Sequence, residues 1–106
     1  AQGARAFRGR DLARFDRQMD DVQRTLAAAR PTAVDPVNAL NAVRAAMAQG
    51  ESVAARQGLA LDAAERFAEE DVAHCRAIGE HGLKLFPDGV RALTHCNAGR
   101  LAFVDI

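Results

Sequence analysis

Apolar residues recur at alternating intervals of three and four positions along the first long segment of the chain. This spacing places them on one face of an α-helix over residues 11–29, with charged residues on the other face. There Arg17 and Asp21 could pair, as could Asp20 and Arg24. The pair Arg30–Pro31 should end the helix, because a residue before proline avoids the helical region. The apolar positions are Leu12, Phe15, Met19, Val22 and Leu26.

The segments on either side also follow helical patterns. Residues 1–9 look like the last turns of a helix that ends at Gly9, where glycine commonly follows a helix end. Asp35 is a good N-cap and Pro36 suits the first helical position, where a missing N–H costs nothing. A second helix is therefore expected from there to a stop at Gly50. Its expected buried side consists of Leu40, Val43 and Met47.

A third and longer helix is predicted from a cap at Ser52 to about Phe86, with a bend or interruption near Gly58. Glycine inside a helix costs about 1 kcal/mol relative to alanine. Gly79 and Gly82 lie three residues apart in this helix despite that cost, so we expect another backbone to pack closely against them. The predicted apolar stripe comprises Leu61, Ala64, Ala68, Val72, Cys75, Gly79, Gly82 and Phe86.

Residues 87–106 no longer follow the helical pattern of apolar positions. Residues 87–89, Pro-Asp-Gly, predict a turn, and residues 90–94 read as a short strand. One strand is not a sheet, so its partners are expected beyond Ile106, and we interpret the chain as a fragment of a longer polypeptide. The predicted organisation is a helical domain over 1–87, with a truncated start, followed by the beginning of an α/β domain over 88–106.

Composition narrows the class of protein. The 106 residues carry 14 basic and 14 acidic side chains, 49% are hydrophobic, and tyrosine and tryptophan are absent. These values exclude disorder, favour helices, and indicate neither a membrane span nor a nucleic-acid or anionic-lipid partner. Cys75 and Cys96 belong to no zinc-type ligand set and are expected to be reduced thiols in a cytoplasmic protein. His74 and His81 lie about 10 Å apart along one helix, too far to share a metal ion.

Candidate chemistry follows the predicted strand. Ligands of open α/β sheets bind outside the carboxyl ends of the strands, which is where Cys96 and Asn97 fall. Gly99 would let the backbone approach a ligand, and a helix beginning near Arg100 would favour an anion and lower the pKa of a thiol. His95 is no base for Cys96, because adjacent strand residues point to opposite faces.

Two motifs add a family resemblance. The run Arg-Pro-Thr-Ala-Val at 30–34 and the run Leu-Thr-His-Cys-Asn-Ala-Gly at 93–99 resemble signatures of the methylthioribose-1-phosphate isomerases. That family includes ribose-1,5-bisphosphate isomerases and regulatory subunits of a eukaryotic translation-initiation exchange factor. The resemblance implies conversion of 5-methylthioribose 1-phosphate to 5-methylthioribulose 1-phosphate in methionine salvage. The fold it implies is a helical N-terminal domain followed by a Rossmann-like domain, of which this chain would hold only the first strand.

The resemblance also implies roles for individual residues. Arg30 matches an arginine that contacts the substrate and is expected to bind its phosphate. Cys96 matches a cysteine at the reacting carbons, and Asn97 matches a substrate-binding position. It implies a cytoplasmic homodimer with no metal and no other cofactor. Asp35 departs from the family's usual asparagine, and the family's Arg-Gly-Ala segment, catalytic aspartate and Asn-Lys pair are absent from the sequence. The alternatives are a ribose-1,5-bisphosphate isomerase and a non-catalytic regulatory relative.

Overall fold

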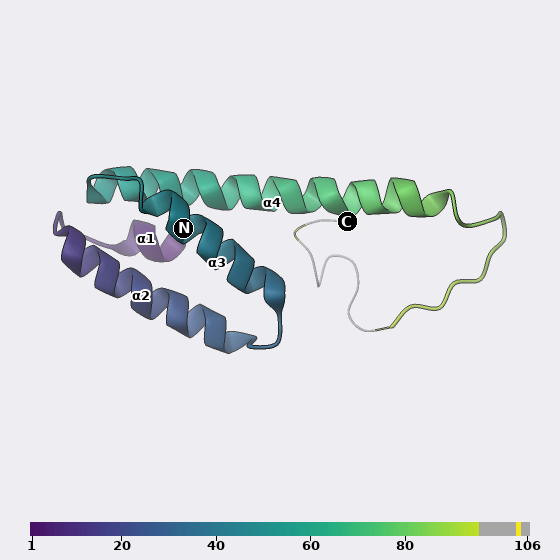
Figure 1. Cartoon of the computed structure of the whole chain (residues 1–106), viewed down its shortest axis with the longest axis horizontal. Coiled ribbons are helices and arrows are strands. Elements are labelled where there is room, and N and C mark those ends of the chain that lie inside the picture. Colours follow the sequence, from purple (N-terminus) through teal and green to yellow (C-terminus); the bar gives the residue numbers. More distant parts are fainter. Residues whose placement is uncertain (96–103, 105–106) are drawn as a thin grey trace. The chain divides into compact units, whose positions relative to one another are not determined.

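Helices dominate the part of the chain that the structure, a computed structural model, describes, namely residues 1–95 and Val104. The chain divides into two compact units, Ala1–Phe67 and Ala68–Ile106. The prediction of a mainly helical chain is confirmed for the described residues. The helices, shown in Figure 1, are α1 (Gln2–Ala6), α2 (Leu12–Ala29), α3 (Val34–Met47) and α4 (Val53–Leu83).

The bounds of α2 follow local chemistry. The Asp11 carboxylate accepts a hydrogen bond from the Arg14 amide at 3.1 Å, which satisfies one of the unpaired donors at the helix start. The helix ends at Ala29, and Arg30 leaves the helical region with φ −142° and ψ 73°, as expected before Pro31. The helix predicted over 11–29 is therefore confirmed.

The start of α3 differs from the prediction. The helix begins at Val34, and Ala33 occupies the N-cap position without a side-chain hydrogen bond, so the predicted cap at Asp35 is wrong. Pro36 lies in the first turn, where backbone N–H groups have no acceptor within the helix, so proline is tolerated there. Asp35 instead places a negative charge near the positive end of the helix dipole.

The long helix α4 begins as predicted and ends earlier. The Ser52 hydroxyl accepts from the Ala55 amide at 3.1 Å, and the helix then continues through Gly58 as one element. It ends at Leu83 rather than at Phe86. The turn predicted at 87–89 is confirmed, because the Val90 amide donates to the Pro87 carbonyl at 3.2 Å, and Gly89 has the positive φ of 75° that glycine adopts without strain.

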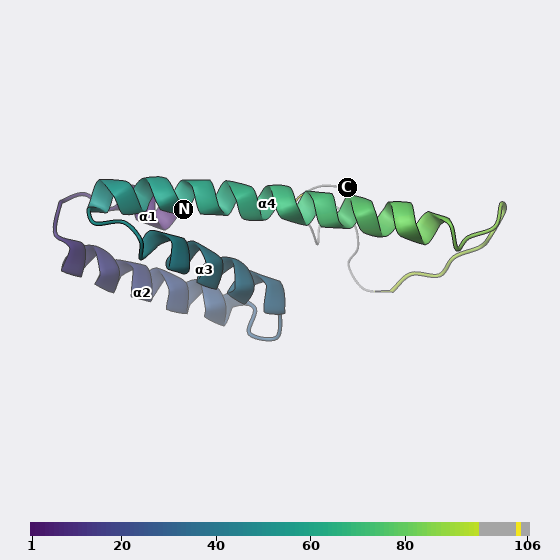
Figure 2. The same cartoon turned by 45° about the horizontal axis from the view of Figure 1, so that its top comes forward.

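The hydrophobic core of Ala1–Phe67 is built around Phe15, which is fully buried. Its ring meets Phe7 edge to face, with centroids 5.3 Å apart and planes at 86°. Figures 1 and 2 both show α2 and α3 side by side, with α1 beside the first turns of α4. The core cluster consists of Ala4, Phe7, Phe15, Met19, Met47, Val53 and Ala60, with Leu12, Val22 and Val43 packed against it.

The predicted apolar stripe of α4 is offset at its start. Ala60 and Ala63 are buried, whereas Leu61 is 45% exposed. Small alanine side chains let α4 approach the core closely, so that packing distance, and not side-chain hydrophobicity alone, decides which face turns inward. The expectation of a backbone packed against Gly79 and Gly82 is also wrong for the described residues, because a Cβ built at either position meets no atom within 4 Å.

The strand predicted over 90–94 is not formed, because residues 90–95 have no regular secondary structure. A strand exists only when its backbone groups pair with a neighbour, and the described residues offer this segment no ladder. The structure therefore confirms the helical part of the predicted fold and leaves the Rossmann-like domain as a prediction. None of the helices in the described residues combines the length and apolar character needed to cross a membrane.

Candidate functional site

Arg30 occupies the turn that joins α2 to α3. Its carbonyl accepts a hydrogen bond from the Ala33 amide at 3.1 Å, which closes the turn, and its side chain is exposed. Within residues 1–95, no carboxylate pairs with the guanidinium and no acceptor holds it. Arg30 is thus a cation on a short, closed turn, with its planar donor fork directed to no other described residue.

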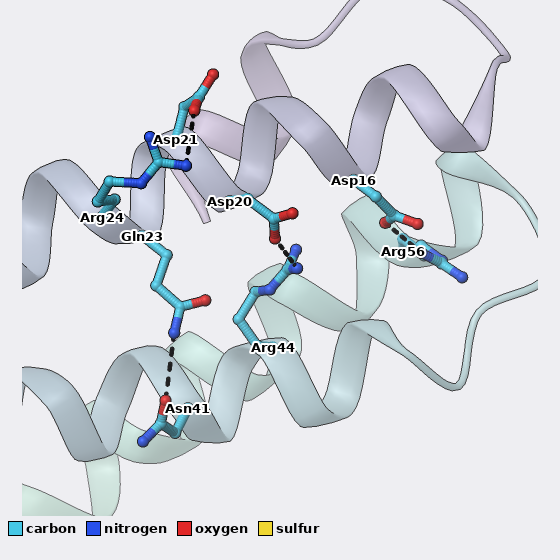
Figure 3. Close-up of polar contacts among 8 residues, drawn as sticks. All are labelled: Asp16, Asp20, Asp21, Gln23, Arg24, Asn41, Arg44 and Arg56. Atoms are coloured by element: carbon cyan, nitrogen blue, oxygen red, sulfur yellow. Dashed lines mark hydrogen bonds and ion pairs between the residues drawn. The ribbon is translucent and has the colours of Figure 1, made fainter.

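Two side-chain pairs join the helices that carry this turn, as Figure 3 shows. The Gln23 amide donates to Asn41 Oδ1 at 3.3 Å, and the Arg44 guanidinium donates to Asp20 Oδ1. Three residues back along α2 correspond to three residues forward along α3, which is the register of an antiparallel hairpin.

Arg56 ties the first turn of α4 to α2. Its Nε donates to the Gly50 carbonyl at 2.8 Å, and its Nη1 donates to Asp16 Oδ1. The Arg56 side chain is only 19% exposed, so this pair is screened less by solvent than an ordinary surface ion pair. The neighbouring Gln57 amide donates to the carbonyls of Ala4 and Phe7 at 2.9 and 3.2 Å, which anchors the end of α1.

These charged side chains border a surface depression of about 430 Å³. Each guanidinium in its lining pairs with a carboxylate, so no unpaired positive charge remains there to recruit phosphate. The depression is therefore a structural junction of three helices, and Arg30 is not part of it. The lining residues are Asp16, Asp20, Arg44, Met47, Ala48 and Arg56.

Sequence reasoning missed the partners in this junction. Asp20 was expected to pair with Arg24 on its own helix. Instead it pairs with Arg44 on α3, while Arg24 pairs with Asp21 at 3.3 Å. The available signal was the spacing of Asp16, Asp20 and Gln23 along one edge of the apolar stripe, which indicates a polar edge that faces another helix.

The two cysteines divide between the described and undescribed parts of the chain. Partial burial on α4, together with the negative charge of Asp71, raises the pKa of the Cys75 thiol above its ordinary value. A raised pKa leaves less of the reactive thiolate at a given pH. Cys96 and Asn97 lie outside the described residues, so their roles remain predictions. In residues 1–95 and Val104, no group of three or more possible ligands is placed to hold a metal ion.

The chain belongs to the initiation factor 2 subunit family, whose model matches residues 1–104. That match includes Arg30, Cys96 and Asn97, and it confirms the resemblance drawn from the two motifs.

Several relatives are named as sugar-phosphate isomerases. The chain is 46% identical over 95 residues to the 5-deoxyribose 1-phosphate isomerase of Moorella thermoacetica, covering 88% of this chain and 27% of the relative. It is 44% identical over 105 residues to the putative methylthioribose-1-phosphate isomerase of Archaeoglobus fulgidus, covering 96% of this chain and 31% of the relative. The chain thus spans less than a third of the length of these two relatives.

A solved structure shares the fold. The crystal structure of the translation initiation factor eIF-2B subunit delta from A. fulgidus superposes with a TM-score of 0.78 and 42% sequence identity. The match covers 97% of this chain and 30% of that one. The described helices therefore correspond to the helical part of a family whose members carry both isomerase and initiation-factor names.

Proposed function

We propose that this chain is part of a sugar-phosphate aldose–ketose isomerase, which converts 5-methylthioribose 1-phosphate to 5-methylthioribulose 1-phosphate. The observation that carries the proposal is the set of relatives named as isomerases of this kind, matched over most of this chain. The run Thr-His-Cys-Asn-Ala-Gly at 94–99 supports it, because the family resemblance that this run carries implies a cysteine at the reacting carbons of the substrate.

Arg30 is the proposed phosphate ligand. A guanidinium is permanently charged and presents parallel N–H donors that match two phosphate oxygens. The exposed turn between α2 and α3 supports this role, since no described residue competes for the side chain.

The chemistry requires more than binding. Phosphate on C1 keeps the sugar closed, so an acid must protonate the ring oxygen as the bond between that oxygen and C1 breaks. Hydrogen then moves from C2 to C1, either as a hydride or as a proton through an enediol-like state, while the C2 hydroxyl loses its proton and becomes the ketone. Cys96 relays the proton in the second route and stabilises the transition state in the first.

Two routes for the hydrogen transfer and two alternative functions can be distinguished by experiment. Deuterium at C2 of the substrate is retained at C1 if hydride moves, and exchanges with water if a proton moves. The relative named 5-deoxyribose 1-phosphate isomerase favours a second candidate substrate that differs at C5. The structural neighbour named as an initiation-factor subunit favours a non-catalytic interaction role.

The test is an assay of the full-length protein, which we expect to be a cytoplasmic homodimer, with 5-methylthioribose 1-phosphate, 5-deoxyribose 1-phosphate and ribose 1,5-bisphosphate. We expect the highest kcat/KM for the first, and a loss of kcat of about 100-fold or more in Cys96→Ser, as for residues that transfer protons. Cys75→Ser is the matched control and should retain kcat. Absence of turnover with all three sugars would overturn the proposal and favour the regulatory role.

A second arm tests Arg30. In Arg30→Lys the charge remains but the planar fork is lost, so transition-state stabilisation should fall by about 1–3 kcal/mol. Wild-type kinetics with a lowered melting temperature would instead assign Arg30 to the cap of α2.

A further inference from the structure

The turn that carries Arg30 is held from a distance by the pairs between α2 and α3. The Asp20–Arg44 pair and the Gln23–Asn41 pair lie on consecutive turns of the hairpin that ends at Arg30 (Figure 3). Continued in the same register, residue 27 falls opposite residue 37, and Arg30 falls opposite Val34 at the closing turn. Arg30 lies ten residues beyond Asp20, which corresponds to about 15 Å along the helix.

We propose that Asp20 is a positioning residue for Arg30, acting through Arg44. The ion pair sets the register of α2 against α3, and the register sets where the closing turn presents the Arg30 guanidinium. The inference rests on the proposed function, because it takes Arg30 to be the phosphate ligand.

The character of the contacts supports this assignment. The apolar contact between α2 and α3 is modest beyond Met19: Leu26 is more than half exposed, and Val34 at the start of α3 is more exposed still. Apolar packing therefore constrains the turn end of the hairpin, next to Arg30, only weakly. The directional pairs of Asp20 and Gln23, farther back along α2, fix the register of the hairpin, since a slide by one residue would break both of them.

A second ion pair on α2 provides a control for the Asp20–Arg44 pair. Asp21 pairs with Arg24 three residues along α2, and both side chains are more than 70% exposed. That pair links no second helix and so cannot set a register. The Arg44 side chain, by contrast, is 29% exposed and crosses from α3 to α2. Asp21→Asn therefore removes the same charge as Asp20→Asn without breaking a contact between α2 and α3.

The experiment is a double-mutant cycle on kcat/KM in the full-length enzyme with 5-methylthioribose 1-phosphate, using Asp20→Asn and Arg30→Ala. Asp20→Asn alone should lower kcat/KM by about 10-fold, within the loss that a misplacement of about 1 Å can cause. In the Arg30→Ala background the same change should have little further effect, because the positioned group is gone. The Ki of inorganic phosphate as a competitive inhibitor should rise in Asp20→Asn and stay unchanged in Asp21→Asn.

Rescue provides the second measurement. Exchanging the pair, as Asp20→Arg together with Arg44→Asp, restores the cross-helix attraction and should recover much of the kcat/KM that either single reversal loses. If Asp20→Asn is too unstable to assay, the exchanged pair tests the positioning role in its place. Melting curves establish that each variant is folded at the assay temperature.

The possible outcomes distinguish failure of the positioning role of Asp20 from failure of the proposed isomerase function. Additive effects of Asp20→Asn and Arg30→Ala, or equal effects of Asp20→Asn and Asp21→Asn, would overturn the positioning role and leave the proposed function intact. Wild-type kcat/KM in Arg30→Ala would overturn the phosphate role of Arg30 and, with it, the inference. No isomerase activity in the wild-type protein would overturn the proposed function itself.

Discussion

Phe15 is the residue on which the core of Ala1–Phe67 most depends. It is the largest fully buried side chain among the described residues, and its ring meets Phe7 edge to face. Removing it leaves a cavity within the core cluster.

We therefore predict that Phe15→Ala lowers the free energy of unfolding by about 3–5 kcal/mol, measured by urea denaturation. Phe86→Ala is the control, since Phe86 is 53% exposed and its truncation should cost less than about 1 kcal/mol. Equal losses in the two variants would contradict the packing described here.

The chemistry of Cys75 leads to a prediction about reactivity. Its pKa is raised above the ordinary value of 9.0, first by desolvation and then by the charge of Asp71. A raised pKa means less thiolate at any pH below it, and the thiolate is the reactive form. In a Cys96→Ser background, alkylation of Cys75 by iodoacetamide at pH 8 should be slower than alkylation of glutathione, and should accelerate as the pH rises. Asp71→Asn should speed the reaction by removing one of the two causes, and an unchanged rate would refute the role given to Asp71.

Gly50, which lies before α4, and Gly58, which lies within it, should respond to substitution by alanine with opposite signs. Gly58 lies within the helix, where an added Cβ meets nothing within 4 Å. Gly58→Ala should therefore stabilise the protein by about 1 kcal/mol, the difference in helix propensity. At Gly50 an added Cβ would lie 2.8 Å from Arg56 Cγ and 2.9 Å from the Arg56 amide nitrogen, so Gly50→Ala should destabilise it. Urea denaturation gives both signs, and stabilisation by both substitutions would show that the approach of Arg56 to Gly50 is not required.

The 106 residues taken together carry an apolar surface that their own described contacts leave exposed. It follows the second half of α4 and the segment after it, and consists of Ile78, Leu83, Leu85, Phe86, Val90 and Leu93. Because the chain spans less than a third of the two isomerases compared above, we predict that residues 1–106 produced alone bind 8-anilinonaphthalene-1-sulfonate and show no isomerase activity. The full-length protein is the control, and turnover by residues 1–106 alone would refute the prediction.

Three helix ends could be predicted from the sequence because they depend on neighbours within four residues. The Asp11 carboxylate caps α2, Ser52 caps α4, and Pro31 ends the first of these helices through interactions that involve only adjacent turns. The turn at 87–89 was predicted for the same reason. Of the candidate site, sequence motifs identified Arg30, Cys96 and Asn97, and the structure places only Arg30.

Contacts between distant residues were decided by the tertiary structure. Asp20 has acceptable cationic partners both four residues and 24 residues away, and only the packing of α2 against α3 selects Arg44. The inward face of α4 likewise depends on how closely alanine lets it approach the core. The segment 90–94 has the composition of a strand, but a strand also needs a paired neighbour, which no local pattern supplies. Local chemistry thus sets the start of α2, its end and the start of α4, while pairing across the fold depends on distances that exist only once the helices have packed.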